Sequence, residues 1–199
     1  MAADRKASTG RVDLYWIPLG AGAALPVVRW SGRAYEALEA RRAGRRARDL
    51  YHAALEIWLD DQRHTLEMAP AWGPGHGGPG VLGEAAVGLR LLGRSRFFRY
   101  EVRRWPDGVI PDLACAVSEP QRVCTDASHA QAVFDGVAEV PLLTWGRDDL
   151  RTGDMWNSNS LVSWSLTKGG VDLDTIALPT NGRAPGWSAG AVAARQSEL

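Results

Sequence analysis

Apolar and polar residues alternate most clearly over residues 50–59, a pattern that predicts a half-buried β-strand. One face of this strand carries Ala53, Leu55, Ile57 and Leu59, and the other carries His52, Ala54, Glu56 and Trp58. The next three residues, Asp60-Asp61-Gln62, are typical of a turn, and residues 64–68 predict the returning strand. The two segments together predict a β-hairpin.

Three further apolar runs predict strands, and three segments with helical spacing predict helices. The strands are expected at residues 11–19, 27–30 and 97–105, and the helices at residues 35–46, 125–137 and 153–170. Residues 71–80 are dominated by Gly and Pro and predict a loop. The chain from Asn181 is also expected to be loop-like, with Arg183, Pro185 and Trp187 packed against the body.

Length and composition place these elements in one folded unit. The chain has 199 residues, 45% of them apolar, and nine tryptophans, which is enough apolar material for a core. We therefore expect a single α+β domain over residues 11–190, in which a small antiparallel sheet packs against helices. Flexible ends are expected at residues 1–10 and 191–199. The expected core and half-core anchors include Trp16, Trp30, Trp58 and Trp164.

Charge and cysteine content narrow the class of protein. Lys plus Arg and Asp plus Glu number 23 each, so the basic excess typical of a nucleic-acid binder is absent. The basic run over residues 41–48 is interpreted as a solvated helix end and loop. No stretch is typical of a secretion signal or long and apolar enough to cross a bilayer. Cys115 and Cys124 lie outside any Cys-x-x-Cys pair, so we expect buried free thiols and a cytoplasmic protein.

The first candidate for a catalytic site is the run Trp156-Asn157-Ser158-Asn159-Ser160, which lies near the start of the helix expected over residues 153–170. Ser158 lies one turn before Leu161, on the side of the helix that turns inward. A hydroxyl there lies close to unpaired N–H groups and to the positive end of the helix dipole, which stabilise a developing anion. Helix capping by Asn and Ser is the alternative explanation, and for this run alone it is the simpler one.

The predicted hairpin supplies a possible base. His52 opens the first strand, and Glu67 lies on the returning strand. If the register puts both side chains on one face, Glu67 would orient the His52 imidazole, as the third member of a catalytic triad does. The alternative is a polar strand-edge histidine and a solvated carboxylate.

Metal and nucleotide sites receive little support. The three histidines His52, His64 and His76, with Asp61 and Glu67, reproduce no recognised ligand spacing, so no metal is expected. The glycine-rich loop lacks the Gly-Lys-Ser/Thr ending of a phosphate-binding loop. No cofactor is therefore expected.

Taken together, these segments resemble the circularly permuted branch of the NlpC/P60 (papain-like) superfamily, which includes lecithin:retinol acyltransferase-like and PPPDE-like proteins. The resemblance rests on three short matches: Tyr51-His52-Ala53-Ala54-Leu55-Glu56-Ile57, Thr65-Leu66-Glu67-Met68-Ala69-Pro70 and Asn157-Ser158-Asn159-Ser160-Leu161. It implies a histidine strand first and a nucleophile helix last. Ser158 stands where that branch has cysteine, and a hydroxyl, unlike a thiol, needs a well-aligned base during attack.

The resemblance implies a hydrolase or acyltransferase acting on an amide or ester carbonyl. Ser158 would attack, His52 would move the proton, Glu67 would orient His52, and helix-start N–H groups would stabilise the oxyanion. Substrate contacts are expected from Trp156, Asn157 and Asn159. The substrate is expected to be a small molecule, a lipid or a peptide. The alternatives are an inactive papain-like module that binds a peptide or small molecule, and a structural partner of another protein.

Overall fold

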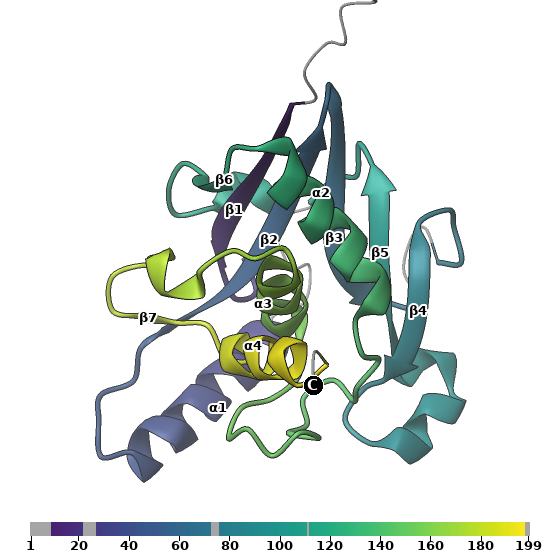
Figure 1. Cartoon of the computed structure of the whole chain (residues 1–199). Helices are drawn as coiled ribbons and strands as arrows, with labels where there is room; N and C mark the ends of the chain where they lie inside the picture. The colour runs from purple at the N-terminus through teal and green to yellow at the C-terminus, as the bar shows by residue number, and fades with distance from the viewer. Residues whose placement is uncertain (1–8, 22–26, 73–75, 111, 198–199) are drawn as a thin grey trace, which may run out of the picture.

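The computed structural model describes residues 9–21, 27–72, 76–110 and 112–197 and has the expected α+β fold (Figure 1). The strands are β1 (Gly10–Pro18), β2 (Asp49–Leu59), β3 (Gln62–Pro70), β4 (Val81–Ala86), β5 (Arg99–Pro106), β6 (Gln121–Cys124) and β7 (Gly182–Arg183). The α-helices are α1 (Val27–Arg42), α2 (Ala127–Gly136), α3 (Ser158–Lys168) and α4 (Trp187–Gln196). Short 3-10 helices are η1 (Arg90–Arg94), η2 (Arg96–Phe98), η3 (Leu113–Cys115), η4 (Val137–Glu139) and η5 (Leu173–Thr175).

Six strands form an antiparallel sheet in the order β4-β5-β3-β2-β1-β6, and β7 pairs in parallel with the start of β2. Helices α2, α3 and α4 lie in front of this sheet in the view of Figure 1. Helices α2 and α3 contact the sheet, and α4 packs against α3. The fold is therefore one sheet covered by helices, as expected from the alternation of strand and helix patterns.

The two faces of the central strands carry different side chains. In the β1–β2 register Leu14 lies opposite Leu55, and both belong to the main core beneath the helices. The other face carries Ile17 and Ala54, which form a small second core with Ile110. Both faces of β2 thus carry buried apolar residues, because Ile110, Leu113 and Ala116 cover the side away from the helices.

The predicted hairpin is confirmed, and its pairing stops before the strands end. Leu59 pairs with Gln62 across the two-residue turn, where Asp60 adopts a φ of 53°. The β2–β3 ladder runs only as far as the Leu55–Leu66 pair. Beyond this point β3 continues beside β5, and the first residues of β2 lose their neighbour on that side.

The strand expected at residues 27–30 is wrong, because these residues form the first turn of α1. Two adjacent valines favour a strand only weakly, and strand preference depends strongly on packing. Helix α1 instead turns Glu36 and Ala40 inward, where both are buried. Trp30, expected as a core anchor, is 71% exposed.

The loop expected from Asn181 onward is also wrong, since this segment forms β7 and α4. Small residues at Ala189, Ala191, Ala193 and Ala194 form the buried side of α4. Alanine and glycine give a weak apolar stripe, so the helix left little signal in the sequence. The expected packing of this segment is confirmed: the Trp187 and Trp16 ring centroids lie 5.2 Å apart.

The remaining elements agree with the sequence except in detail. The helices expected at residues 125–137 and 153–170 correspond to α2 and α3, and the strand expected at 97–105 corresponds to β5, which η2 precedes. Strands β4 and β6 were not predicted. Both cysteines are free, as expected, but neither is buried: Cys115 is exposed and Cys124 is half-buried.

Candidate functional site

The start of α3 is attached to β2 by the side chain of Asn159. Its Oδ1 accepts a hydrogen bond from the Ala53 N–H (2.6 Å), and its Nδ2 donates to the Tyr51 carbonyl oxygen (3.0 Å). These two backbone groups flank His52. The helix start is therefore held directly beside the strand residue that carries the imidazole.

The local strand geometry explains why α3 can approach here. The β2–β3 ladder has ended at Leu55–Leu66, so the backbone groups of Tyr51 and Ala53 need other partners. Asn159 supplies both, in the place that β3 has left. Ser158, the preceding residue, consequently lies at a gap between two strands and can meet a side chain from the face of β2 that points away from the helices.

Ser158 and His52 line the same cavity, which has a volume of about 400 Å³. Glu67 and Asp112 also line it, so the cavity holds a hydroxyl, an imidazole and two carboxyl groups. Its apolar lining consists of Leu19, Ala21, Ala53, Ala54, Leu66, Met68, Pro70, Ile110, Trp145, Leu161 and Val162. A second cavity of about 270 Å³ also includes His52 and Ser158. Two distant parts of the sequence are thus brought to one accessible site.

The ring of His52 is hydrogen-bonded to Asp112. The distance from His52 Nε2 to Asp112 Oδ2 is 2.8 Å, and the two side chains are 21% and 19% exposed. A carboxylate can only accept a hydrogen bond, so Nε2 is the donor in this contact and Nδ1 is the ring nitrogen that remains for another partner. Asp112 was not predicted, because it lies 60 residues from His52 in a segment without strand or helix periodicity.

Glu67 lies in the same cavity on the expected face of the sheet. Extending the hairpin register by one pair places Glu67 opposite Ala54, which shares its face with His52. Burial raises the pKa of the Glu67 carboxyl, the nearby Asp112 raises it further, and Arg103 opposes both effects. In the described part of the chain, however, the hydrogen-bond partner of the His52 ring is Asp112 rather than Glu67. Two acidic groups therefore line the cavity that holds the imidazole, and one of them, Asp112, is in contact with it.

Asn157 caps the start of α3, and the Ser158 side chain takes no part in the capping. Asn157 Oδ1 accepts from the Asn159 N–H (2.9 Å), and the Asn157 carbonyl accepts from the Ser160 and Leu161 N–H groups. Ser158 is the first residue inside the helix. Among the described residues, neither its hydroxyl nor its N–H has a hydrogen-bond partner. Helix capping thus explains the presence of Asn157 but not that of Ser158. Of the first N–H groups of α3, the one that could still donate to a bound oxyanion is that of Ser158 itself.

Three residues expected to contact substrate have other partners. Trp156 is 1% exposed, and its indole N–H donates to the Tyr100 hydroxyl (3.2 Å). Asn157 and Asn159 are buried, and the Nδ2 group of each donates to the Pro185 carbonyl oxygen (2.8 Å). A buried Trp156 does not form a cleft wall. All three side chains help to position the helix that carries Ser158, and Asn157 and Asn159 also line the 270 Å³ cavity.

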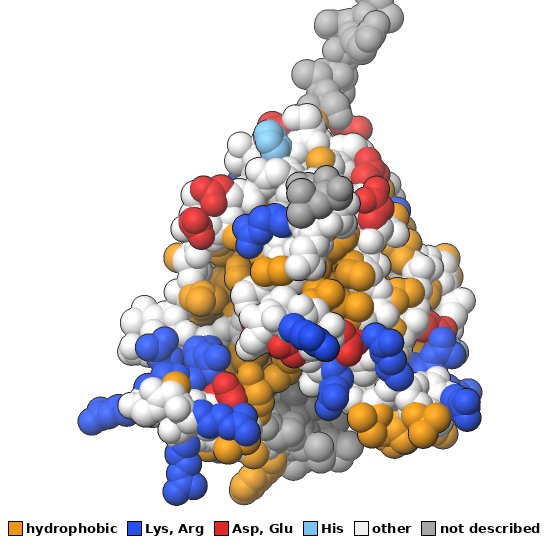
Figure 2. Space-filling model, turned by 60° about the horizontal axis from the view of Figure 1, so that its bottom comes forward, with side chains coloured by type: hydrophobic (Ala, Val, Ile, Leu, Met, Phe, Trp, Pro, Cys, Tyr) orange, Lys and Arg blue, Asp and Glu red, His pale blue; other side chains and the backbone are white. Residues whose placement is uncertain are grey.

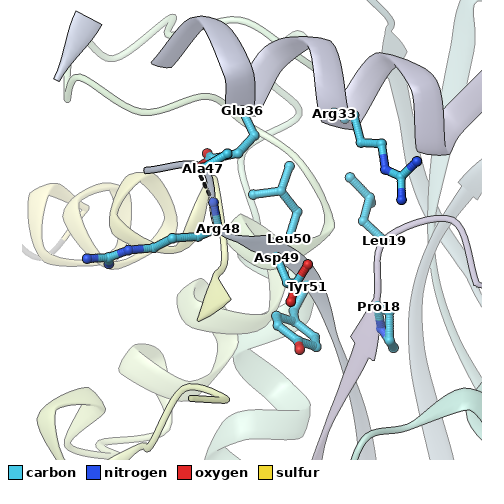
Figure 3. A pocket seen from close by; sticks show the side chains of 10 residues that line it. Pro18, Leu19, Arg33, Glu36, Ala47, Arg48, Asp49, Leu50 and Tyr51 are labelled. Carbon is cyan, nitrogen blue, oxygen red and sulfur yellow. Dashed lines mark hydrogen bonds between the residues drawn. The ribbon is translucent and has the colours of Figure 1, made fainter. Parts of the chain in front are cut away.

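A third cavity lies between α1 and the start of β2 (Figure 3). It has a volume of about 500 Å³ and shares Leu19, Leu50 and Tyr51 with the 270 Å³ cavity beside Ser158. The carboxylate of Glu36 accepts a hydrogen bond here from the Arg48 N–H (2.9 Å). The Glu36 carboxylate is thus already hydrogen-bonded within the protein. The lining of this larger cavity does not combine a serine hydroxyl with an imidazole, as the cavity beside Ser158 does.

One group of metal-ligand types occurs among the described residues, and the sequence spacing did not reveal it. The ligand atoms of His76, Glu84 and Glu101 lie within 4.8 Å of one another. Glu101 is fully buried, contacts His76 and accepts from Arg103 Nε (2.8 Å), while Glu84 pairs with Arg99 (3.0 Å). Because both carboxylates already pair with arginines, the group fits an ion-pair network better than a cation site.

Comparisons with protein-family models, with curated proteins and with solved structures found no match to this chain. Among the described residues, none of the helices has the length and apolar content required to span a membrane.

Proposed function

We propose that this chain is a hydrolase or acyltransferase that acts on an ester or amide carbonyl through Ser158, His52 and Asp112. The observation that supports this best is the 2.8 Å contact between His52 Nε2 and Asp112, in a cavity that Ser158 also lines. A nucleophile, a base and a carboxylate that orients the base are the three parts of a triad mechanism. The order of His52 and Ser158 in the chain is the one that the resemblance to permuted papain-like proteins implies, whereas Asp112 lies outside the strand that follows the histidine strand.

The proposed reaction has two steps. In the first, His52 Nδ1 takes the proton of Ser158 Oγ as the oxygen attacks the carbonyl carbon, and Asp112 stabilises the imidazolium that forms. The Ser158 N–H donates to the oxyanion. The imidazolium then protonates the leaving alcohol or amine, and an acyl-Ser158 ester remains. In the second step, water or an acceptor alcohol or amine attacks this ester with His52 again as base, which regenerates Ser158.

The lining of the cavity indicates the substrate class. Beside the polar groups the cavity is lined by apolar side chains, including Leu66, Met68, Leu161 and Val162. Burial of apolar surface favours an acyl group or side chain without charge next to the reacting carbonyl. We therefore propose a small-molecule, lipid or peptide substrate with an apolar acyl portion. Nucleic acid is not among the proposed ligands, and the cytoplasm remains the proposed location.

Covalent labelling with a fluorophosphonate tests the nucleophile. We expect one adduct, located at Ser158 by mass spectrometry and lost in Ser158→Ala and in His52→Ala. An unlabelled native protein, or an adduct at another residue, would contradict the proposal and favour the inactive binding module.

A matched pair of acid variants tests which carboxylate orients His52. With an aryl ester substrate, Asp112→Asn should lower kcat/KM by on the order of a hundredfold or more, since it leaves the imidazole in the wrong tautomer. Glu67→Gln should cause a smaller loss, because Glu67 is near the ring without bonding to it. The opposite order would restore Glu67 as the orienting residue.

A further inference from the structure

An unusual surface is formed by residues 88–99, which include η1 and η2 and are here called the apolar–basic surface. None of the side chains of η1 and η2 is buried. Leu91 is 68% exposed and Phe97 is 64% exposed. The other large exposed apolar residues of the segment are Leu89, Leu92 and Phe98. A cluster of five large exposed apolar side chains in one short segment is uncommon on a monomeric protein and indicates a binding surface.

The same segment carries positive charge and no negative charge. It contains Arg90, Arg94, Arg96 and Arg99, and no Asp or Glu occurs between Glu84 and Glu101. Arg99 pairs with Glu84, and Arg90 reaches Asp149 at 3.5 Å while remaining 79% exposed. In Figure 2 apolar and basic side chains gather at the lower right of the molecule, in the region where this segment lies in Figure 1.

The backbone holds these side chains outward. Three successive turns are closed by N–H to carbonyl hydrogen bonds from Leu92 to Leu89, from Ser95 to Leu92 and from Phe98 to Ser95. The Val87 N–H donates to the Phe98 carbonyl (2.8 Å) and closes the base of the segment. The segment is thus braced by its own backbone, and its apolar side chains lack a core of their own to enter.

We propose that the apolar–basic surface docks on an anionic lipid bilayer. The leucine and phenylalanine side chains would enter the boundary between headgroups and acyl chains, and the arginines would contact lipid phosphates. An anionic bilayer offers an apolar interior and negatively charged headgroups, and the exposed apolar side chains and the arginines of this segment match these two features. This proposal goes beyond the enzymatic function and does not depend on it.

The surface is connected to the candidate site through Trp145. The Gly88 N–H donates to the Trp145 carbonyl (2.9 Å), and Trp145 lines both cavities that contain Ser158. The apolar–basic surface therefore begins at a residue that is bonded to the wall of these cavities.

Vesicle flotation tests the proposal. The full chain should float with phosphatidylcholine vesicles that contain phosphatidylglycerol and bind about tenfold or more weakly to phosphatidylcholine alone. The double variant Leu91→Ser with Phe97→Ser should lose about tenfold or more of the binding. Arg94→Gln with Arg96→Gln should cause a similar loss and reduce the dependence on salt.

Matched variants elsewhere on the surface are the controls. Leu178→Ser removes an exposed leucine far along the chain, and Arg151→Gln with Arg195→Gln removes the same charge from other exposed positions. These controls should bind as the wild type does, and circular dichroism should show that all variants are folded. Failure to float with anionic vesicles, or equal losses in test and control variants, would overturn the proposal. So would a dimer that depends on Leu91 and Phe97 and does not bind vesicles.

Discussion

At the scale of single residues, the amide of Asn159 joins three segments of the chain. It bonds to Ala53 and Tyr51 on β2 and to Pro185 after β7, and it is 2% exposed. An amide suits this place because it offers an acceptor to one N–H and two donors to two carbonyl groups. The sequence located the start of α3 at the Asn-Ser-Asn-Ser run, but a side chain that binds the backbone and one that binds substrate look alike in a sequence.

The substitution Asn159→Asp should destabilise the protein by about 2–4 kcal/mol. It keeps the shape and replaces the donor that faces Tyr51 and Pro185 with an acceptor, which leaves buried carbonyl groups unpaired. Urea unfolding measures the change. Because Asn159 also holds α3 beside His52, Ser158 labelling should fall as well. An unchanged midpoint would show that these hydrogen bonds do not matter for stability.

The substitution Ser158→Cys tests the contact between Ser158 and His52. If His52 Nδ1 faces position 158, the new thiol should have a lowered pKa, because an imidazolium stabilises the thiolate. The pH profile of alkylation, measured in a Cys115→Ser, Cys124→Ser background, reports this pKa. A profile that His52→Ala leaves unchanged would contradict the pairing.

At the scale of elements, α3 and α4 approach so closely that glycine is required between them. A Cβ atom on Gly190 would lie 2.0 Å from the Ser160 carbonyl oxygen and 2.2 Å from Ser163 Oγ. Ser160 and Ser163 lie on the α3 side of this close approach, and the buried residues of α4 are alanines and a glycine. The helix contact therefore depends on small side chains, which explains why α4 left so weak a pattern in the sequence.

The substitution Gly190→Ala should lower the free energy of unfolding by about 1–3 kcal/mol, because the helices must move apart. Gly32→Ala on α1 is the matched control: its Cβ would meet mainly the end of the Leu19 side chain, which can move. The control should lose less stability, since alanine also favours a helix over glycine. Thermal unfolding of both variants compares them, and equal losses would contradict the close approach of α3 and α4.

At the scale of the whole molecule, the buried carboxylate of Glu36 connects distant parts of the chain. It pairs with Arg45 and with Arg183 (2.7 Å) and accepts from the Arg48 N–H, as Figure 3 shows for the last contact. Helix α1, the loop before β2 and strand β7 thus meet at one side chain. The hydrogen bond from Arg45 is the main cause that lowers the pKa of Glu36 from 4.5 to about 2.

Glu36→Gln should lose about 3 kcal/mol of stability at neutral pH. Since the folded-state pKa is lowered, the stabilisation is complete above pH 4.5 and is lost as the pH falls toward 2. The difference between wild type and variant should therefore stay constant from pH 7 to about pH 5 and narrow as the pH falls from there toward 2, as measured by urea unfolding. Glu39→Gln, which removes a more exposed partner of Arg42, should change stability by less than about 1 kcal/mol. A difference that does not depend on pH would contradict this account of Glu36.

The sequence by itself determined the elements whose patterns are local: the hairpin of β2 and β3, helices α2 and α3, and the polar start of α3. Alternation and helical spacing are properties of neighbouring residues, so they can be found without a fold. Only the tertiary structure decided that Asp112 contacts His52, that Asn159 occupies the edge β3 leaves, and that α4 packs on α3. These contacts join residues far apart in the chain, and no periodic pattern records which distant backbone or side chain each will meet.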